Sequence, residues 1–350
     1  MAVTTLSIGN ELLSTTMHIV MKEWRDNIYT STALLDAQTR VHGEGQPTQA
    51  GGTRIVVPLG FGEHSNTTKM STGYERIDLS VEDVFQPAVY DFGHVVRPVA
   101  ISAEEEMTNQ GDAAVLSILE NRVTSVANAL KREYVKHIVQ GGVANWDDWN
   151  TLNGIGSDTT NGYLENAAAG SGSQDSSVGG VSKATFSSKT GWNNQFFDIA
   201  DSFNSNGLAG LYDLMVEINA VSAQGNPNVI LASRAGFKNL KRALQASERY
   251  MDEKSIDGGK MSTTFQGVPI DVEYYMPNAG TSSATTEASF YFLNMNDIYT
   301  LWDPKGYFDL SDFETVSGEY DVRAAKLRCR GQLIAKHLGS SALAVNGDTF

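Results

Sequence analysis

The side chains with the greatest capacity for chemistry in this sequence are six histidines, a single cysteine and a few close carboxylates. Histidines of one metal site usually recur at short, fixed spacings, as in a His-Glu-x-x-His helix. None of the six stands at such a spacing from another; they are His18, His42, His64, His94, His137 and His337. The sequence therefore predicts no metal site, unless the fold gathers distant histidines.

Two groups of carboxylates resemble catalytic or cation-binding clusters. Asp147 and Asp148 are adjacent, and the tryptophans on either side of them indicate a loop that packs on the surface. Three further carboxylates alternate imperfectly later in the chain: Asp309, Asp312 and Glu314. A solvated strand edge explains these three, and a cation-binding cluster is the alternative.

The other signatures of chemistry are also missing from the sequence. It contains neither a Walker-type Gly-Lys-Ser/Thr loop nor a Gly-x-Ser-x-Gly elbow. Cys329 is the only cysteine, so no disulfide can form within the chain, and we interpret it as a small buried hydrophobe. We expect no catalytic residue, no cofactor and no enzymatic activity.

The composition is typical of a folded protein that does not bind nucleic acid non-specifically. A length of 350 residues exceeds what one core usually organises and predicts one large or two intertwined domains. Proteins that bind nucleic acid without regard to sequence cluster Lys and Arg on phosphates, and a net charge of −15 argues against that class. With no signal peptide and no membrane-spanning stretch in the sequence, we expect a soluble protein made in a cytoplasm.

The first third of the chain is a polar, β-rich arm. A helical segment is expected within residues 10–40, followed by a glycine-rich loop. Strands are expected at residues 53–58, 74–81 and 88–96, and Lys69 falls near the exposed tip between the first two. Pro58 would end the first strand or place it on a sheet edge. Because such a ribbon has little apolar surface of its own to bury, we expect it to lie against another copy of the chain.

One long helix is predicted over residues 103–140. Ser102 and Glu105 form a capping box, in which each side chain accepts a hydrogen bond from a free backbone N–H group. Apolar residues then recur at spacings of three and four positions: Leu116, Leu119, Val123, Val126 and Leu130. A continuous helix of this length would extend about 57 Å, with an interruption near Gly111.

The rest of the chain separates into a loop and an α/β module. Residues 146–190, and above all the Ala/Gly/Ser-rich part at 167–183, predict an exposed loop or insertion. Helices are expected over residues 208–223 and 234–246, the second of them capped by Ser233. Strands are expected at residues 228–232, 265–272, 289–293, 322–330 and 334–345.

Several short motifs occur in an order that points to one family. Val99-Ala-Ile-Ser-Ala-Glu-Glu-Glu-Met is similar to the lead into that family's spine helix, and Arg249-Tyr-Met followed by Phe265-Gln-Gly-Val-Pro-Ile is similar to a passage of its axial domain. Phe292-Leu-Asn-Met-Asn-Asp with Trp302-Asp-Pro is similar to a strand and turn of its peripheral domain. From about Gly51 to the C-terminus, the chain resembles the major capsid proteins of tailed phages, which have the HK97-like fold.

The resemblance implies an α+β, HK97-like capsid fold with five parts. They are an N-terminal arm (1–50), an extended β-loop (51–98), a peripheral domain with the long spine helix (99–145 and 297–332), a flexible loop or insertion (146–190) and an axial α/β domain (191–296 and 333–350). The extended loop would lie over an adjacent subunit, and the axial domain would lie at the centre of each hexamer or pentamer.

The resemblance also implies function and partners. The chain would be a structural major capsid protein that self-assembles in the host bacterial cytoplasm into an icosahedral virion head around double-stranded DNA. A separate scaffolding protein is expected because the arm begins almost at Met1, together with a portal and a decoration protein, and the DNA would not be bound sequence-specifically. We expect cations of the extended loop to meet acids of a neighbouring subunit: Arg54, Lys69 and Arg76 with Glu104, Glu105 and Glu106.

Two other functions remain open from the sequence. Within the same fold, an encapsulin-like shell would enclose a cargo enzyme, and a cargo-docking groove would favour it. From a different class, a β-rich surface or adhesion protein would explain the Thr, Ser and Gly content, but it would require secretion.

Overall fold

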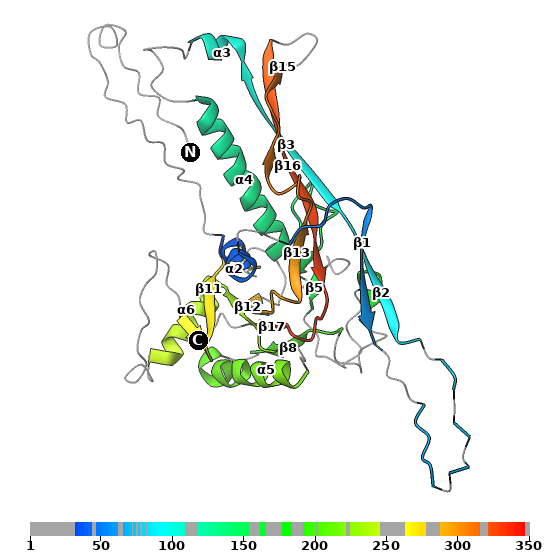
Figure 1. Ribbon diagram of the computed structural model, residues 1–350. Coiled ribbons are helices and arrows are strands. Elements are labelled where there is room, and N and C mark those ends of the chain that lie inside the picture. The colour runs from blue at the N-terminus through cyan, green and yellow to red at the C-terminus, as the bar shows by residue number, and fades with distance from the viewer. Residues whose placement is uncertain are drawn as a thin grey trace.

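The computed structural model of the chain is elongated, with a long helix beside a long sheet, a second sheet with its own helices, and a ribbon that projects from the body (Figure 1). The structure describes residues 32–43, 47–61, 66–71, 73–74, 76–77, 79–81, 83–108, 118–153, 162–165, 177–183, 192–199, 202–221, 225–245, 263–277, 288–315 and 321–346. Most of the helix expected within residues 10–40 therefore lies outside the described residues.

The longer sheet is built around a single strand of 14 residues, β16 (Val322–Ala335). β3 (Gly93–Ser102) pairs antiparallel with β16 along its whole length. The opposite edge of β16 pairs with three shorter strands: β13 (Ile298–Trp302), β14 (Asp309–Leu310) and β15 (Glu314–Thr315). Alternate residues are buried in the first part of β16, Cys329 among them, and all of the last five residues are buried. This confirms Cys329 as a small buried hydrophobe.

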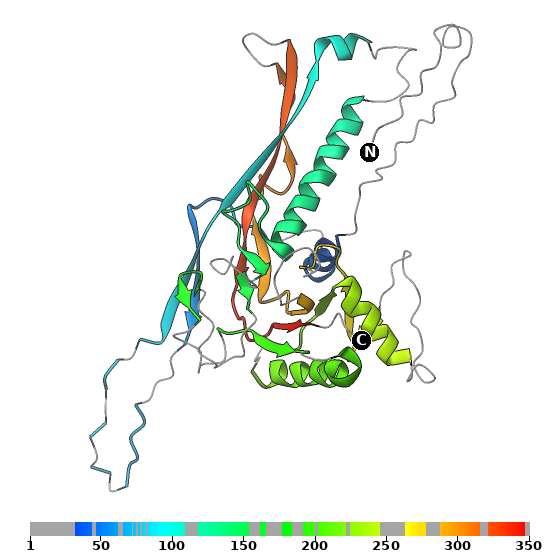
Figure 2. The same ribbon diagram turned by 180° about the vertical axis from the view of Figure 1, so that it is seen from behind.

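Helices occupy both ends of the range predicted for the long helix, and the interruption expected near Gly111 lies outside the described residues. The two helices are α3 (Ala103–Thr108) and α4 (Ile118–Gln140), and residues 109–117 between them lie outside the described part. At 23 residues, α4 is about 34 Å long, and it lies along the long sheet (Figure 2). An ion pair of 2.6 Å between Arg97 Nη2 and Glu133 Oε1 joins α4 to β3.

An aromatic cluster fills the space between α4 and the long sheet. The ring of Tyr134 lies 5.8 Å from that of Trp146, 5.7 Å from that of Trp149 and 5.2 Å from that of Trp302. All four side chains are buried, whereas Asp147 and Asp148 between the two loop tryptophans are exposed. The two carboxylates therefore lie on a surface loop, as expected, and the tryptophans hold that loop on the core. A Cβ atom at Gly93 would lie 2.3 Å from the Trp149 indole, which explains why a glycine starts β3.

The predicted flexible loop at residues 146–190 also contributes to the core. Its described residues form four short strands: β4 (Thr151–Asn153), β5 (Gly162–Leu164), β6 (Ser177–Val178) and β7 (Val181–Ser182). Leu164, Val178 and Val181 are buried. The expectation of an exposed loop is wrong for these residues, because a few apolar side chains among Gly and Ser are enough to fix the segment on the core.

The second sheet has six strands in the order β10-β11-β9-β12-β17-β8. Their bounds are β8 (Gln195–Asp198), β9 (Val229–Ala232), β10 (Thr263–Phe265), β11 (Val268–Val272), β12 (Ala288–Leu293) and β17 (Ala342–Val345). One face packs on α5 (Leu208–Val221), its preceding π-helical turn η3 (Phe203–Gly207) and α6 (Arg234–Gln245). The other face joins the aromatic core.

Short sequence features determine where a helix of this sheet layer begins and where a hairpin turns. Ser233 Oγ accepts a hydrogen bond of 2.9 Å from the N–H of Gly236, which confirms the predicted cap of α6. The single strand predicted at residues 265–272 is instead the hairpin β10–β11. Its two turn residues, Gln266 and Gly267, have φ angles of +49° and +84°, which is typical of a tight turn that matches the twist of the strands.

The helix α2 (Ala33–His42) crosses between the two sheets. Arg40 Nη2 lies 2.9 Å from Asp271 Oδ2 at the end of β11, and Gln38 Nε2 donates a hydrogen bond of 3.2 Å to Thr300 Oγ1 on β13. α2 therefore holds the end of the N-terminal segment on both halves of the molecule.

Candidate inter-subunit surface

The projecting ribbon begins as an antiparallel pair of strands, β1 (Arg54–Gly60) and β2 (Phe85–Asp91). Ile55, Val57 and Leu59 alternate with exposed residues and are buried. Pro58 lies within β1, and among the described strands β1 pairs with β2 alone. Pro58 therefore stands on an edge strand, as expected, because proline cannot donate a ladder hydrogen bond.

The base of the ribbon is fixed firmly to the body. Tyr90 donates a hydrogen bond of 2.9 Å from its hydroxyl to the carbonyl of Ala335, and the N–H of Val89 donates one of 2.8 Å to the carbonyl of Gly179. Gly179 has a φ of +59°, and a Cβ atom there would lie 2.8 Å from the Cβ of Ala88. The turn between β6 and β7 therefore supports the base only because it carries a glycine.

Beyond the base, the ribbon leaves the body and runs without regular structure in its described residues. The strand predicted at residues 74–81 is wrong for the residues described there. Asn66 Nδ2 donates a hydrogen bond of 2.6 Å to the carbonyl of Ser80, which holds the two arms together. The alternation of Ile77, Leu79 and Val81 is present, but no surface of the same chain buries it.

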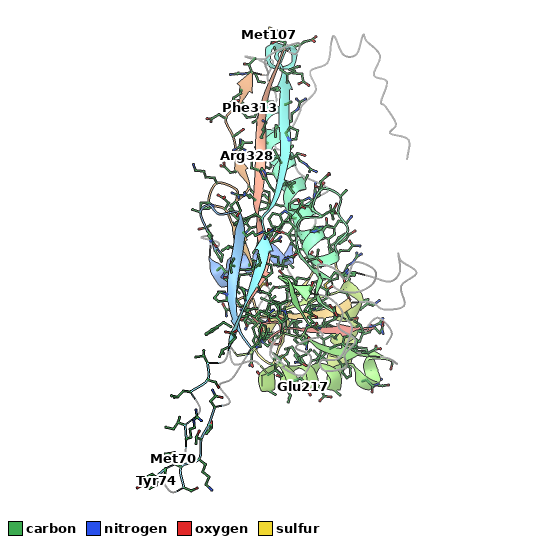
Figure 3. The ribbon with its side chains drawn as sticks, turned by 90° about the vertical axis from the view of Figure 1, so that its right-hand side faces the viewer. Met70, Tyr74, Met107, Glu217, Phe313 and Arg328 are labelled. Carbon is green, nitrogen blue, oxygen red and sulfur yellow. The ribbon has the colours of Figure 1, made fainter. Side chains whose placement is uncertain are left out.

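The far part of the ribbon exposes a set of large apolar side chains, here called the ribbon patch. Tyr74 is 96% exposed, Val81 90% and Leu79 84%. The whole patch consists of Met70, Tyr74, Ile77, Leu79, Val81 and Phe85. Met70 and Tyr74 lie at the tip, far from the rest of the molecule (Figure 3). Exposed apolar residues gathered in this way mark a binding surface for another protein.

The predicted cations of the ribbon differ in their surroundings. Arg54 Nε lies 2.7 Å from Asp91 Oδ1 on the paired strand, and both side chains are well exposed. An exposed pair of this kind contributes little to stability. Lys69 and Arg76 are exposed near the ribbon patch.

The predicted acids lie in the first turn of α3, and Glu105 has partners within the chain. The N–H of Ser102 donates to Glu105 Oε2 at 3.2 Å, and the N–H of Glu105 donates to Ser102 Oγ at 3.3 Å, which confirms the capping box. Arg122 on α4 binds both carboxylate oxygens, at 2.6 and 2.8 Å. The Arg122 guanidinium and the backbone N–H of Ser102 lower the pKa of Glu105 to about 2. Glu104 is exposed, and the side chain of Glu106 lies outside the described residues.

Two of the predicted cations, Lys69 and Arg76, stand at the opposite end of the molecule from the predicted acids, whereas Arg54 lies at the start of β1 beside Asp91. In Figure 3, Met107 in α3 marks one end, and Met70 and Tyr74 mark the other. Lys69 and Arg76 therefore cannot reach α3 of their own chain, and a contact between these groups requires a second copy.

Sequence reasoning missed a buried carboxylate that holds α2. Glu273 is 1% exposed, and its Oε2 accepts a hydrogen bond of 3.0 Å from the N–H of Leu34 in the first turn of α2. Its Oε1 accepts hydrogen bonds from the N–H groups of Tyr274 and Tyr275, at 3.0 and 3.4 Å. Thr32 at the N-cap position makes no side-chain cap bond. Burial raises the pKa of Glu273 to about 7 in spite of these bonds. No local pattern marks Glu273, because it caps a helix 239 residues away.

Glu273 should make stability depend on pH. Between pH 4.5 and about 7 the folded chain holds the Glu273 proton more tightly than the unfolded chain does, so stability falls as pH rises through this window. In Glu273→Gln this contribution disappears, and the unfolding free energy of the variant relative to wild type should rise by about 3 kcal/mol across the window. Urea unfolding of both proteins at several pH values measures the difference, and parallel pH curves would contradict the prediction.

Three of the described histidines bind the backbone, and the described histidines do not gather at a metal site. His42 Nε2 lies 2.8 Å from the carbonyl oxygen of Met295, His137 Nε2 lies 3.0 Å from that of Trp149, and His337 Nδ1 accepts the N–H of Ser340. No group of three or more potential metal ligands occurs among the residues that the structure describes. Within the same residues, no helix combines the length and apolarity that a membrane span requires.

The sequence matches no family model and no curated protein, whereas the structure is similar to several solved shells. The capsid asymmetric unit of Cyanophage A-1(L) has a TM-score of 0.64 at 13% identity, over 98% of this chain and 99% of that chain. The capsid of the empty GTA particle has a TM-score of 0.60 at 12% identity, over 95% of each chain. The holo-SrpI encapsulin complex from Synechococcus elongatus PCC 7942 has a TM-score of 0.57 at 10% identity, over 98% and 97%.

These similarities extend over nearly the whole length of each chain, and they establish the fold. The chain has an α+β, HK97-like capsid fold, as the motifs of the sequence predicted. The projecting ribbon, the long helix beside the long sheet and the second sheet with its helices are parts of this one architecture (Figure 1).

Proposed function

We propose that this chain is a structural major capsid protein of a tailed phage. Copies assemble into hexamers and pentamers of an icosahedral head that encloses double-stranded DNA. The main support for this proposal is the ribbon patch. Tyr74, Leu79 and Val81 are almost completely exposed in the monomer, and such apolar side chains need a partner to cover them. Similarity to phage capsid subunits from end to end supports the same conclusion.

The proposed parts of the chain follow the division expected from the sequence. The arm at residues 1–50 and the extended loop at 51–98 reach neighbours, while residues 99–145 with 297–332 form the peripheral domain. Residues 191–296 with 333–350 form the axial domain. The ribbon lies over an adjacent copy, with Lys69 and Arg76 near Glu104 and Glu106 of that copy, and Arg54 and Glu105 at the borders of the contact.

The wider partners are part of the proposal. A separate scaffolding protein, a portal and a decoration protein would act with the chain in the virion after assembly in the host cytoplasm. DNA would lie beside the shell without sequence-specific contacts, which the net charge of −15 favours.

An encapsulin-like shell is the second candidate. The encapsulin structure from Synechococcus elongatus PCC 7942 matches over almost the full length of both chains, so the fold alone is compatible with a cargo compartment. The two functions differ in the content of the particle, which is DNA for a capsid and a protein cargo for an encapsulin.

Particle size and content test the proposal. The chain is expressed alone and with its scaffolding protein, and mass photometry and electron microscopy record the products. Rings and megadalton shells are expected. Shells isolated from phage particles should contain double-stranded DNA; a protein cargo in place of DNA would favour the compartment. A stable 37.9 kDa monomer under all conditions would overturn both candidates.

A further inference from the structure

The helix α5 exposes an unusual outer face. Its inner side buries Leu211, Leu214 and Ile218 against the six-stranded sheet. On its outer side, Tyr212 is 48% exposed and Val216 is 65% exposed, one turn apart. A solvated helix normally presents polar residues on its outer side, so this apolar stripe is typical of a covered surface.

An acidic row runs beside the apolar stripe of α5. Asp213 and Glu217 are exposed, each next to a stripe residue and one turn apart, and α5 contains no basic residue. Glu217 lies on the outer border of the molecule, away from the sheet (Figure 3). The ring of Tyr212 lies 4.9 Å from that of Phe265, so one edge of the apolar stripe packs on β10.

The helix α6 has the opposite charge. It carries four basic residues and no acidic residue within 12 positions: Arg234, Lys238, Lys241 and Arg242. Its inner side buries Phe237 and Leu240, so the basic residues gather on its outer side, in a chain whose net charge is −15.

Two bases of α6 stand where they do not stabilise the helix that carries them. Arg234 and Lys238 are four positions apart, where like charges repel, whereas Arg242 lies in the last turn, where the helix dipole favours a cation. Arg234 also occupies the first turn, where the helix dipole disfavours a cation; its guanidinium lies over the ring of Tyr274 at 4.7 Å. An anionic surface outside the helix would offset the repulsion between Arg234 and Lys238.

The two helices complement each other but face different directions. α5 lies along the lower border of the molecule and α6 along a neighbouring border, in both Figure 1 and Figure 2. Within the described part of the chain, no ion pair joins Asp213 or Glu217 to a base of α6. Two complementary faces that point apart on one subunit suit a heterologous contact, which closes into a ring when it repeats around an axis.

We propose that the basic outer face of α6 of one copy docks on the acidic and apolar outer face of α5 of the next copy around each ring. The inference rests on the proposed capsid function and names the surfaces that would join neighbours within a hexamer or pentamer. Complementary charge sets the register and excludes wrong pairings, while Tyr212 and Val216 supply apolar area. A nucleic acid on α6 is the competing occupant, but it would leave the apolar stripe of α5 uncovered.

A charge swap tests the contact. Lys238→Glu with Lys241→Glu should abolish rings and shells, since the net charge of α6 falls from +4 to zero and two glutamates in its centre then face the acids of α5. Asp213→Lys with Glu217→Lys should also abolish rings and shells, because two lysines of α5 would then face the bases of α6. The variant with all four changes should recover rings and shells, because the pairing is restored with the charges exchanged. Mass photometry and electron microscopy measure assembly, and circular dichroism confirms that each variant is folded.

Matched controls distinguish the loss of this contact from a general effect of net charge, and a wild-type control tests the proposed function separately. Lys305→Glu with Lys326→Glu, and Asp147→Lys with Asp148→Lys, make the same charge changes at exposed sites away from α5 and α6, and they should assemble. Loss of assembly in these controls, normal assembly of either helix variant, or no recovery in the folded four-change variant would overturn the contact. Normal shells that no longer retain DNA after the α6 changes would assign α6 to nucleic acid instead. A wild-type chain that forms no ring or shell would overturn the proposed function itself.

Discussion

Replacing Tyr74, Leu79 and Val81 by serine is expected to abolish shell formation while leaving the isolated chain folded. The three side chains are 96%, 84% and 90% exposed, so the monomer loses almost no packing when they are removed. On a neighbour, each would be buried, and burial of a large apolar side chain stabilises by roughly 1.5–3 kcal/mol. In the proposed shell each subunit both extends a ribbon and receives one, so the loss would be repeated at every contact.

The measurement compares assembled mass with monomer stability. Mass photometry of the serine variant should show monomers or small oligomers where wild type shows shells, and its urea unfolding curve should overlay that of the wild-type monomer. Tyr74→Phe, Leu79→Ile and Val81→Ile together preserve the apolar surface and should still assemble. Wild-type yields of shells from the serine variant would show that the ribbon patch is not an assembly surface.

The sequence predicts a structural feature correctly where the two groups that stabilise it are close together in the chain. The capping box of Ser102 and Glu105 and the cap of α6 by Ser233 are found as predicted, because each involves groups three residues apart. The motifs from Val99 onward gave the fold class, which the similarity to solved capsids confirms.

The incorrect predictions have one physical cause. In each case the contact that determines the structure involves a residue far away in the sequence or a surface outside the described chain. Trp146 and Trp149 lie in a sequence that is typical of a loop, and only the approach of Tyr134 and Trp302 shows that they are core residues. The alternation at Ile77 predicts a half-buried strand. The buried half would require a surface that the described part of this chain does not provide.

The predicted inter-subunit residues also separate into those whose partners lie within the chain and those that remain predictions. Arg54 and Glu105 were expected at a subunit contact, but Asp91 and Arg122 bind them within the chain. Sequence spacing could not reveal these pairs, because β-ribbon pairing and the packing of α4 bring the partners together. Lys69 remains a predicted contact residue, and its exposure on the ribbon is compatible with that role.

Breaking the buried pair of Lys183 and Glu165 is expected to destabilise the fold more than any other single change considered. Lys183 Nζ donates hydrogen bonds of 2.7 Å to the carbonyl of Tyr163 and 3.2 Å to Glu165 Oε1. The two side chains are 0% and 6% exposed, and burial lowers the pKa of Lys183 to about 8. Lys183→Met leaves a carboxylate buried without its cation, and removal of one partner of a buried pair reduces stability by about 3–5 kcal/mol.

A double-mutant cycle identifies the cause of this loss. Lys183→Met and Glu165→Leu should each lower the unfolding free energy strongly in urea titrations, because each leaves the opposite charge unpaired. The double variant should regain most of the loss, since replacing a buried ion pair by apolar residues of similar volume is often neutral. Additive losses in the double variant would mean that packing, and not the uncompensated charge, determines the effect. Strong coupling would instead show that this ion pair acts together with the buried side chains of Leu164, Val178 and Val181 in fixing to the core a segment whose sequence is typical of a loop.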